Sequence, residues 1–108
     1  MGRLVYGTKG NSIEMDDRTL AHLRLVVMTK LRRAECFMLD VPLADGRGSH
    51  RSVWLHPSVP LVFHFYGNRQ PRINRTWAEQ MVQAAGGPDG LTIGPEPEES
   101  VRLPTFAP

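Results

Sequence analysis

The clearest periodic pattern along the chain is a stripe of apolar residues between positions 18 and 34. Its members recur at spacings of three and four residues, which places them on one face of an α-helix. They are Leu20, Leu23, Val27, Leu31 and Ala34. Asp16 or Asp17 precedes the stripe and has the short acceptor side chain that an N-cap position favours. The pattern therefore predicts an amphipathic helix from about residue 18 to residue 33.

A second helix is predicted from about residue 76 to residue 85. Thr76 and Glu79 match the T-x-x-E capping box that begins many helices. The apolar stripe that follows consists of Trp77, Met81 and Ala84. Residues 86–88 (GGP) combine two glycines with a proline, and we expect the helix to end there.

Shorter runs of β-branched and aromatic residues predict strands. The expected strands cover residues 3–7, 12–15, 36–43, 52–55, 61–66 and 91–93. The first two flank residues 8–11 (TKGN), a glycine-containing turn that indicates a hairpin. The third, fourth and fifth strands follow one another through turn-rich segments, residues 44–50 and 56–60. We expect these three strands to form a meander.

The predicted order of elements is ββαβββαβ, which indicates the α+β class. Because most strands are joined by short connections, we expect a largely antiparallel sheet with both helices packed on one face. A chain of 108 residues has the usual size of one domain. The sequence therefore predicts a single α+β domain over residues 1–94. Residues 95–108, with four prolines and three glutamates, are predicted to form a flexible tail.

The composition favours a cytoplasmic protein. Cys36 is the single cysteine and cannot form an internal disulfide, and the first residues lack the basic and apolar regions of a signal peptide. The longest apolar stretch, residues 25–28, has four residues, whereas a membrane span needs about 20. We therefore expect no membrane partner.

Charge is distributed unevenly along the chain. Twelve of the 13 Lys and Arg residues lie in residues 1–94, together with 8 of the 11 acidic residues, although the net charge of the whole chain is only +2. The predicted tail is locally acidic. A modestly basic body can attract anionic partners, but it lacks the strongly basic charge of most dedicated nucleic-acid binders.

Arginines gather on one side of the first predicted helix and in two predicted loops. Arg18, Arg32 and Arg33 lie, together with His22, opposite the apolar stripe of the helix. The loop residues are Arg47, Arg51, Arg69, Arg72 and Arg75. Arginines make sequence-independent contacts to a phosphate backbone, so these eight are candidates for binding nucleic acid. The alternative is that they are solvated side chains on a helix face and in loops.

Three apolar residues of the first helix, Leu25, Val26 and Met28, fall outside its stripe. The helix is therefore apolar over more of its circumference than one packed face requires. This surplus predicts a second contact surface, formed with another strand layer, with a protein partner or with a second copy in a homodimer.

The residue types that carry chemistry do not form a complete motif. The four histidines are His22, His50, His56 and His64, and no two of them have the i, i+4 spacing of a helical metal site. Cys36 adjoins Phe37, a context typical of a buried thiol.

The sequence predicts no metal, cofactor or catalytic residue, so a non-catalytic module that binds nucleic acid is the leading hypothesis. A protein-interaction module is the alternative, and an enzyme with an unrecognised loop site is a third.

Four segments in a fixed order resemble a family of short actinobacterial proteins over about residues 2–97. The segments are residues 16–23 (DDRTLAHL), 30–33 (KLRR), 52–57 (SVWLHP) and 74–77 (NRTW). Many members carry the automatic label ATP-dependent DNA ligase, so the resemblance implies an association with DNA. Such ligases use a lysine in a K-x-D-G motif, whereas GNS follows Lys9 and LRR follows Lys30. We therefore expect at most an accessory fragment without the catalytic lysine.

Overall fold

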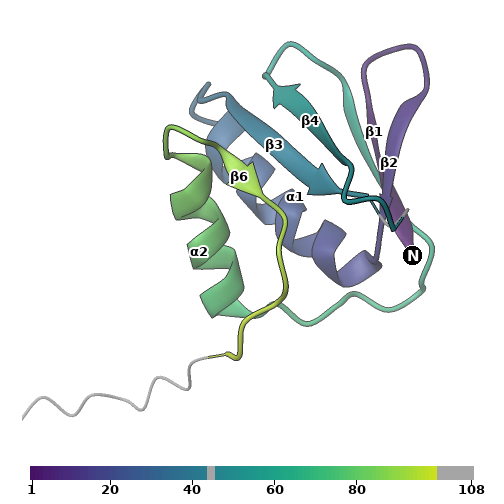
Figure 1. Cartoon of the computed structure of the whole chain (residues 1–108), viewed down its shortest axis with the longest axis vertical. Coiled ribbons are helices and arrows are strands. Elements are labelled where there is room, and N and C mark those ends of the chain that lie inside the picture. Colours follow the sequence, from purple (N-terminus) through teal and green to yellow (C-terminus); the bar gives the residue numbers. More distant parts are fainter. Residues whose placement is uncertain (44–45, 100–108) are drawn as a thin grey trace, which may run out of the picture.

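The computed structural model describes residues 1–43 and 46–99, which form two helices and six strands (Figure 1). The strands are β1 (Gly2–Tyr6), β2 (Asn11–Met15), β3 (Phe37–Pro42), β4 (His50–Leu55), β5 (Leu61–Phe65) and β6 (Leu91–Thr92). The helices are α1 (Asp17–Leu31) and α2 (Arg75–Ala85). The predicted α+β class and the order ββαβββαβ are confirmed. Residues 44–45 of the predicted turn-rich segment 44–50 and residues 100–108 of the predicted tail lie outside the described residues.

The strands form two sheets of three strands each. In the first sheet, ordered β2-β1-β5, the central strand β1 pairs antiparallel with both neighbours. In the second sheet, ordered β4-β3-β6, β3 pairs antiparallel with β4 and parallel with β6. The pairing is therefore mostly antiparallel, as expected.

The predicted meander of β3, β4 and β5 is wrong, because β5 pairs with β1 of the first sheet. Pro57 and Pro60 lie in the connection between β4 and β5, and proline cannot continue a strand ladder. The carbonyl of Pro60 instead accepts a hydrogen bond of 2.9 Å from the N–H of Gly7, at the end of β1. This contact delivers the chain to the first sheet just before β5 begins.

One hydrophobic core joins both sheets and both helices. α1 packs against β1 and β5, α2 packs against β3 and β6, and the two helices contact each other. Leu4 of β1, Leu23 of α1 and Leu39 of β3 have no exposed surface, and removing each from water stabilises the fold by roughly 1.5–3 kcal/mol. Neither helix of the described residues is long and apolar enough to cross a lipid bilayer.

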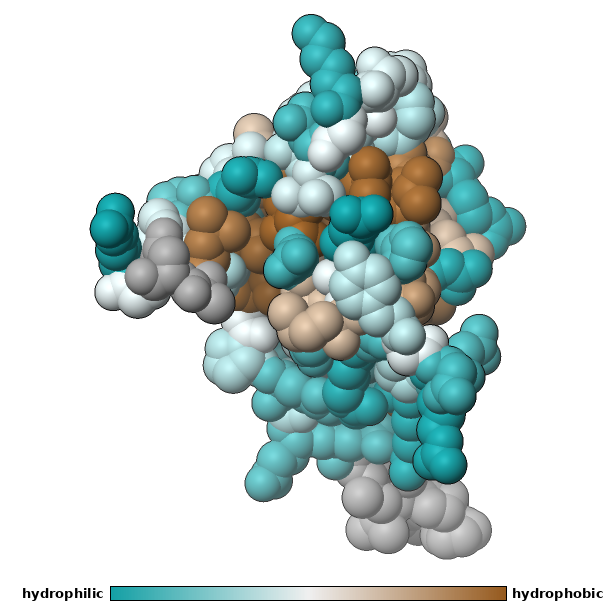
Figure 2. All heavy atoms as spheres, turned by 90° about the vertical axis from the view of Figure 1, so that its right-hand side faces the viewer, coloured by the Kyte–Doolittle hydropathy of each residue, from teal (hydrophilic) through white to brown (hydrophobic). Residues whose placement is uncertain are grey.

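The outer face of the first sheet remains exposed. Cross-strand pairing places Val5 beside Val62 and Arg3 beside both Glu14 and His64 on this face. Viewed from the side that carries β1 and β2, apolar side chains gather in a band across the upper part of the molecule (Figure 2). Hydrophilic side chains dominate the lower part, the level at which the β5–α2 connection runs in Figure 1.

Helix α2 begins at a different residue from the one predicted. Asn74 is the N-cap, and its side-chain oxygen accepts a hydrogen bond of 3.2 Å from the N–H of Trp77. Thr76 therefore lies inside the helix, and the predicted capping box of Thr76 and Glu79 is wrong. Asparagine caps helices at least as well as threonine, so the shift of two residues costs nothing. The helix ends at Gly86, as predicted.

Helix α1 begins and ends within two residues of its prediction. Asp16 is the N-cap, although its carboxylate accepts from the hydroxyl of Thr19 rather than from a backbone N–H. At the other end, Ala34 has a left-handed backbone with φ of 57°, and the N–H of Glu35 donates to the carbonyl of Lys30. Glycine is the usual residue at such a helix end, so Ala34 holds local strain.

Replacing Ala34 by glycine is expected to raise the free energy of unfolding by about 0.5–1 kcal/mol. The left-handed conformation costs a residue with a Cβ roughly 1–2 kcal/mol, and the greater freedom of glycine in the unfolded chain offsets part of that gain. Urea unfolding followed by circular dichroism measures the change. Ala84→Gly, inside α2, is the matched control and should lower stability by about 0.5–1 kcal/mol. A lower stability of Ala34→Gly would contradict the strain.

Candidate functional site

A buried histidine links the two helices. His22 has no exposed surface, and its Nδ1 lies 2.7 Å from the carbonyl of Arg18 while its Nε2 lies 2.8 Å from the backbone N of Asn74. The N–H of Asn74 can only donate, so Nε2 accepts and the ring hydrogen resides on Nδ1. The imidazole also packs on Trp77, with ring centroids 4.5 Å apart. The sequence pattern placed His22 on the polar side of the helix, whereas this side faces α2.

Asn74 uses its backbone and its side chain to hold three parts of the chain. It is 2% exposed, and besides capping α2 its Nδ2 donates to Oε2 of Glu96 at 2.9 Å and to the carbonyl of Pro97 at 2.8 Å. These bonds dock the start of the predicted tail against the junction of α1 and α2. Asn74 was not predicted as a site residue, although an asparagine just before a helical run is a recognisable cap signal.

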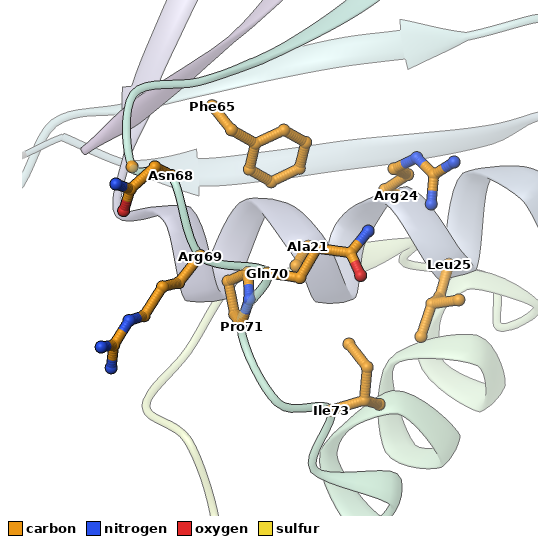
Figure 3. Close-up of a pocket in the computed structure, with 10 residues that line it drawn as sticks. Ala21, Arg24, Leu25, Phe65, Asn68, Arg69, Gln70, Pro71 and Ile73 are labelled. Carbon is orange, nitrogen blue, oxygen red and sulfur yellow. The ribbon is translucent and has the colours of Figure 1, made fainter.

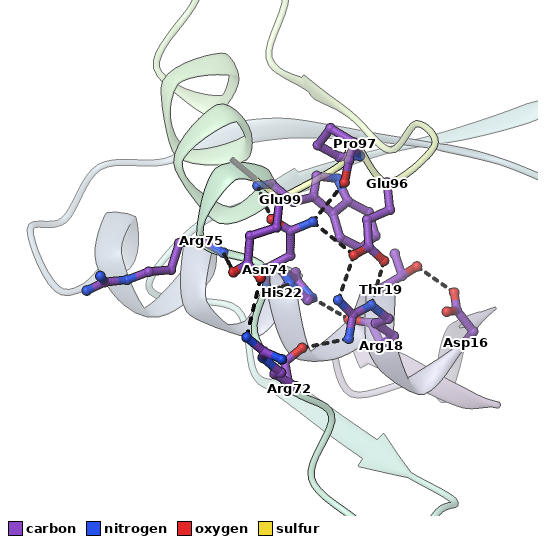
Figure 4. Close-up of polar contacts among 11 residues, drawn as sticks. Asp16, Arg18, Thr19, His22, Arg72, Asn74, Arg75, Glu96, Pro97 and Glu99 are labelled. Atoms are coloured by element: carbon purple, nitrogen blue, oxygen red, sulfur yellow. Dashed lines mark hydrogen bonds and ion pairs between the residues drawn. The ribbon is translucent and has the colours of Figure 1, made fainter. Parts of the chain in front are cut away.

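Arg18 binds Glu96 through two parallel hydrogen bonds. Its Nε lies 2.5 Å from Oε1 and its Nη2 lies 2.6 Å from Oε2, while Nη1 donates to the carbonyl of Arg72 at 2.7 Å (Figure 4). The guanidinium of Arg18, helped by the amide of Asn74, lowers the pKa of Glu96 to about 2. The same contact raises the pKa of Arg18. The pair is therefore fully ionised at neutral pH.

A second carboxylate lies beside the first. Oε1 of Glu99 is 3.6 Å from Nη2 of Arg72, and Oε2 is 3.4 Å from the backbone N of Arg75. That N–H belongs to the first turn of α2, where the helix dipole favours negative charge. We call Arg18 and Arg72, whose guanidinium groups contact these two carboxylates, the arginine cluster, and residues 96–99 the acidic segment. Arg75 contributes its backbone N–H alone, and its side chain points away from the cluster (Figure 4).

The structure brings together two of the eight predicted arginines, Arg18 and Arg72, at the acidic segment. Arg69 lies on the same exposed segment as Arg72, three positions earlier. Arg51 donates to the carbonyl of Ser12 at 3.0 Å, which ties β4 to β2. Arg47 lies in the turn before β4. Arg32 and Arg33 follow the last turn of α1, about 20 Å along the helix from Arg18. The eight arginines therefore do not line one surface.

A hollow of about 340 Å³ lies between α1 and the segment that follows β5. Asp17 positions this segment, because its carboxylate accepts from the N–H groups of Tyr66 at 3.3 Å and Gly67 at 2.8 Å. The walls are Ala21, Arg24, Leu25, Phe65, Gly67, Asn68, Arg69, Gln70, Pro71 and Ile73 (Figure 3). We call this cavity the α1 hollow.

The three residues predicted to form a partner surface lie in different surroundings. Val26 is buried in the core and has no exposed surface. Leu25 lines the α1 hollow, and Met28 is 41% exposed. The partner surface itself stays a prediction, and only Leu25 and Met28 of the three are available to it.

The described residues hold no group of three or more His, Cys, Asp and Glu side chains close enough to share a metal ion. Cys36 is exposed, in contrast to the buried thiol that its neighbour Phe37 suggested. The bidentate contact of Arg18 with the carboxylate of Glu96 shows that this site can bind an oxyanion through charge-assisted hydrogen bonds.

The low pKa of Glu96 predicts how the docking of the acidic segment depends on pH. Because the folded value of about 2 lies below the ordinary value of 4.5, the stabilisation is complete above about pH 4.5 and is lost as pH falls through 2. The side-chain amide resonance of Asn74 in NMR spectra should therefore shift with a midpoint near pH 2. Glu96→Gln should abolish this transition, and a midpoint near 4.5 in the wild type would exclude the bidentate pair.

A family model described as a domain of unknown function, DUF7882, matches residues 1–96. The match includes both sheets and both helices and ends at Glu96, the residue that Arg18 binds. No curated protein and no solved structure matches the chain. The chain belongs to the DUF7882 family, a domain of unknown function.

Proposed function

We propose that this protein is a non-catalytic module that binds nucleic acid through its arginine cluster. The observation that carries the proposal is the bidentate grip of Arg18 on the carboxylate of Glu96. A guanidinium holds a phosphate with the same pair of parallel hydrogen bonds. The carboxylates of Glu96 and Glu99 thus occupy positions that two phosphate groups of a nucleic-acid backbone would take.

The cluster is open enough for such an exchange. The side chain of Arg72 is 86% exposed and that of Arg18 is 37% exposed. Arg69 lies on the same segment as Arg72 and is also exposed, so it extends the row of cations toward the α1 hollow. A phosphate backbone that follows this segment would meet several guanidinium groups in succession.

The two lysines of the chain favour a role without covalent chemistry. Lys9 lies in the exposed turn between β1 and β2, and Lys30 forms an ion pair of 3.3 Å with Glu35. Neither is followed by the residues of a ligase nucleophile motif. A relation to DNA ligases, as the resemblance implies, would therefore be that of an accessory fragment that contacts DNA.

Titration of labelled single-stranded and duplex DNA over a range of salt concentrations tests the proposal. Arg69→Ala/Arg72→Ala should weaken binding and reduce the slope of log affinity against log salt by roughly 1.4 on single strands, since each phosphate contact contributes about 0.7. Arg3→Ala/Lys9→Ala carries the same charge change at a distance from the cluster and should preserve the slope. Absence of binding to both DNAs at low ionic strength would refute the proposal.

The same titration can also test variants that are expected to raise the affinity for DNA. Glu96→Gln/Glu99→Gln should bind DNA several-fold more tightly than the wild type, because the neutral amides compete less strongly for the guanidinium groups. Glu14→Gln/Asp89→Asn changes the net charge equally at positions outside the acidic segment and should produce a smaller gain. Equal gains in the two double variants would show that overall charge, and not the arginine cluster, governs affinity.

A homodimer is the second candidate, and the placement of two apolar residues favours it. Leu25 and Met28 lie three residues apart on one face of α1, where Met28 is 41% exposed and Leu25 lines the hollow. Static light scattering at high protein concentration is expected to report twice the mass of the chain if this face is shared. A mass of one chain at every concentration would exclude the homodimer.

A further inference from the structure

We propose that the α1 hollow receives one unstacked base of a single-stranded nucleic acid whose phosphates lie along the arginine cluster. The inference rests on the proposed function and adds a substrate class to it. It follows from the chemistry of the hollow and from the position of the hollow relative to the arginines.

The interior of the hollow suits a flat apolar ring. Phe65, Leu25 and Ile73 direct their side chains toward it, and Ala21 of α1 lies between them with only a methyl group (Figure 3). The exposed aromatic surface of a base stacks favourably on such residues whatever its sequence. A volume of about 340 Å³ is at the lower end of the roughly 300–1,000 Å³ typical of small-molecule sites, which suits a single base.

Polar groups surround this apolar interior. The side-chain amides of Asn68 and Gln70 lie on the segment that covers the hollow, and each can both donate and accept a hydrogen bond. The edges of bases carry donors and acceptors in the same way. Arg24 lies at the rim next to Phe65, whereas the guanidinium of Arg69 points away from the hollow into solvent (Figure 3). Both arginines are thus positioned to meet phosphates on either side of a bound base.

The hollow and the arginine cluster share one stretch of chain. Pro71 and Ile73 line the hollow, and Arg72 between them contacts Glu99 of the acidic segment. One extended segment therefore presents apolar walls to one side and a cation to the other. A nucleic-acid strand alternates apolar bases with phosphates, and this arrangement is complementary to it. Bases in a duplex are stacked and paired, so the ligand is single-stranded.

Oligonucleotides with and without bases separate this inference from the proposed function. The probes are an oligothymidylate and an abasic strand of the same length, which keeps every phosphate. The wild type should bind the oligothymidylate about tenfold more tightly, the gain that stacking of one base supplies. Ala21→Leu fills the hollow without altering an arginine and should bind both strands with the affinity of the wild type for the abasic strand.

Ala84→Leu, at an exposed position of α2, is the matched control and should keep the tenfold preference. In the wild type, the side-chain amide resonances of Gln70 should shift with the oligothymidylate and not with the abasic strand, which tests the site without any substitution. Equal affinity of the wild type for both strands, or a preference that survives in Ala21→Leu, would overturn the base site and leave phosphate binding intact. Failure of both strands to bind would refute the proposed function as well.

Discussion

The hydrogen bond from the N–H of Asn74 to the imidazole of His22 is the contact on which the arrangement of the helices depends. It lies in the core, and a buried N–H without a partner costs about 1–3 kcal/mol. Both partners make further hydrogen bonds: His22 with the carbonyl of Arg18, and Asn74 with the carboxylate of Glu96. No buried side-chain nitrogen or oxygen among the described residues lacks a partner, so this network is fully satisfied.

The same network sets the direction of the arginine cluster. The carbonyl of Arg18 is held by His22 and its guanidinium by the carbonyl of Arg72, so the charged group projects beside the N-terminus of α2. The carboxylate that binds it, that of Glu96, lies 78 positions later in the chain. An exposed ion pair alone contributes little to stability, typically 0–1 kcal/mol. Its importance here lies in the geometry that the buried residues impose on it.

Sequence patterns within single segments predicted most of the helices and strands. They could not predict which strands pair with one another. The stripe through Leu20 and Leu23 predicted α1 because helical spacing is visible within one segment. β5 pairs with β1 and not with β4, and this pairing depends on residues far apart in the chain. The alternation of apolar and polar residues within one strand does not indicate which strand lies beside it.

In the candidate site, too, single residues could be predicted from the sequence but the contacts between distant segments could not. Arg18 and Arg72 were identified by charge alone, but their meeting with Glu96 and Glu99 across the chain was not predictable from either segment. His22 was assigned to the polar side because helical spacing places it with Arg18 opposite the apolar stripe, and only the packing of α2 on that side buries it.

The central position of β1 has a consequence for how the protein folds during synthesis. β1 is synthesised well before one of its two partners, β5, which begins at Leu61. β3 likewise cannot pair with β6 until that strand, which begins at Leu91, has been synthesised. Closing such distant pairs slows folding, and until then the unpaired edges are open to other chains. The first sheet therefore stays incomplete until β5 has been synthesised, and the second until β6 has been synthesised.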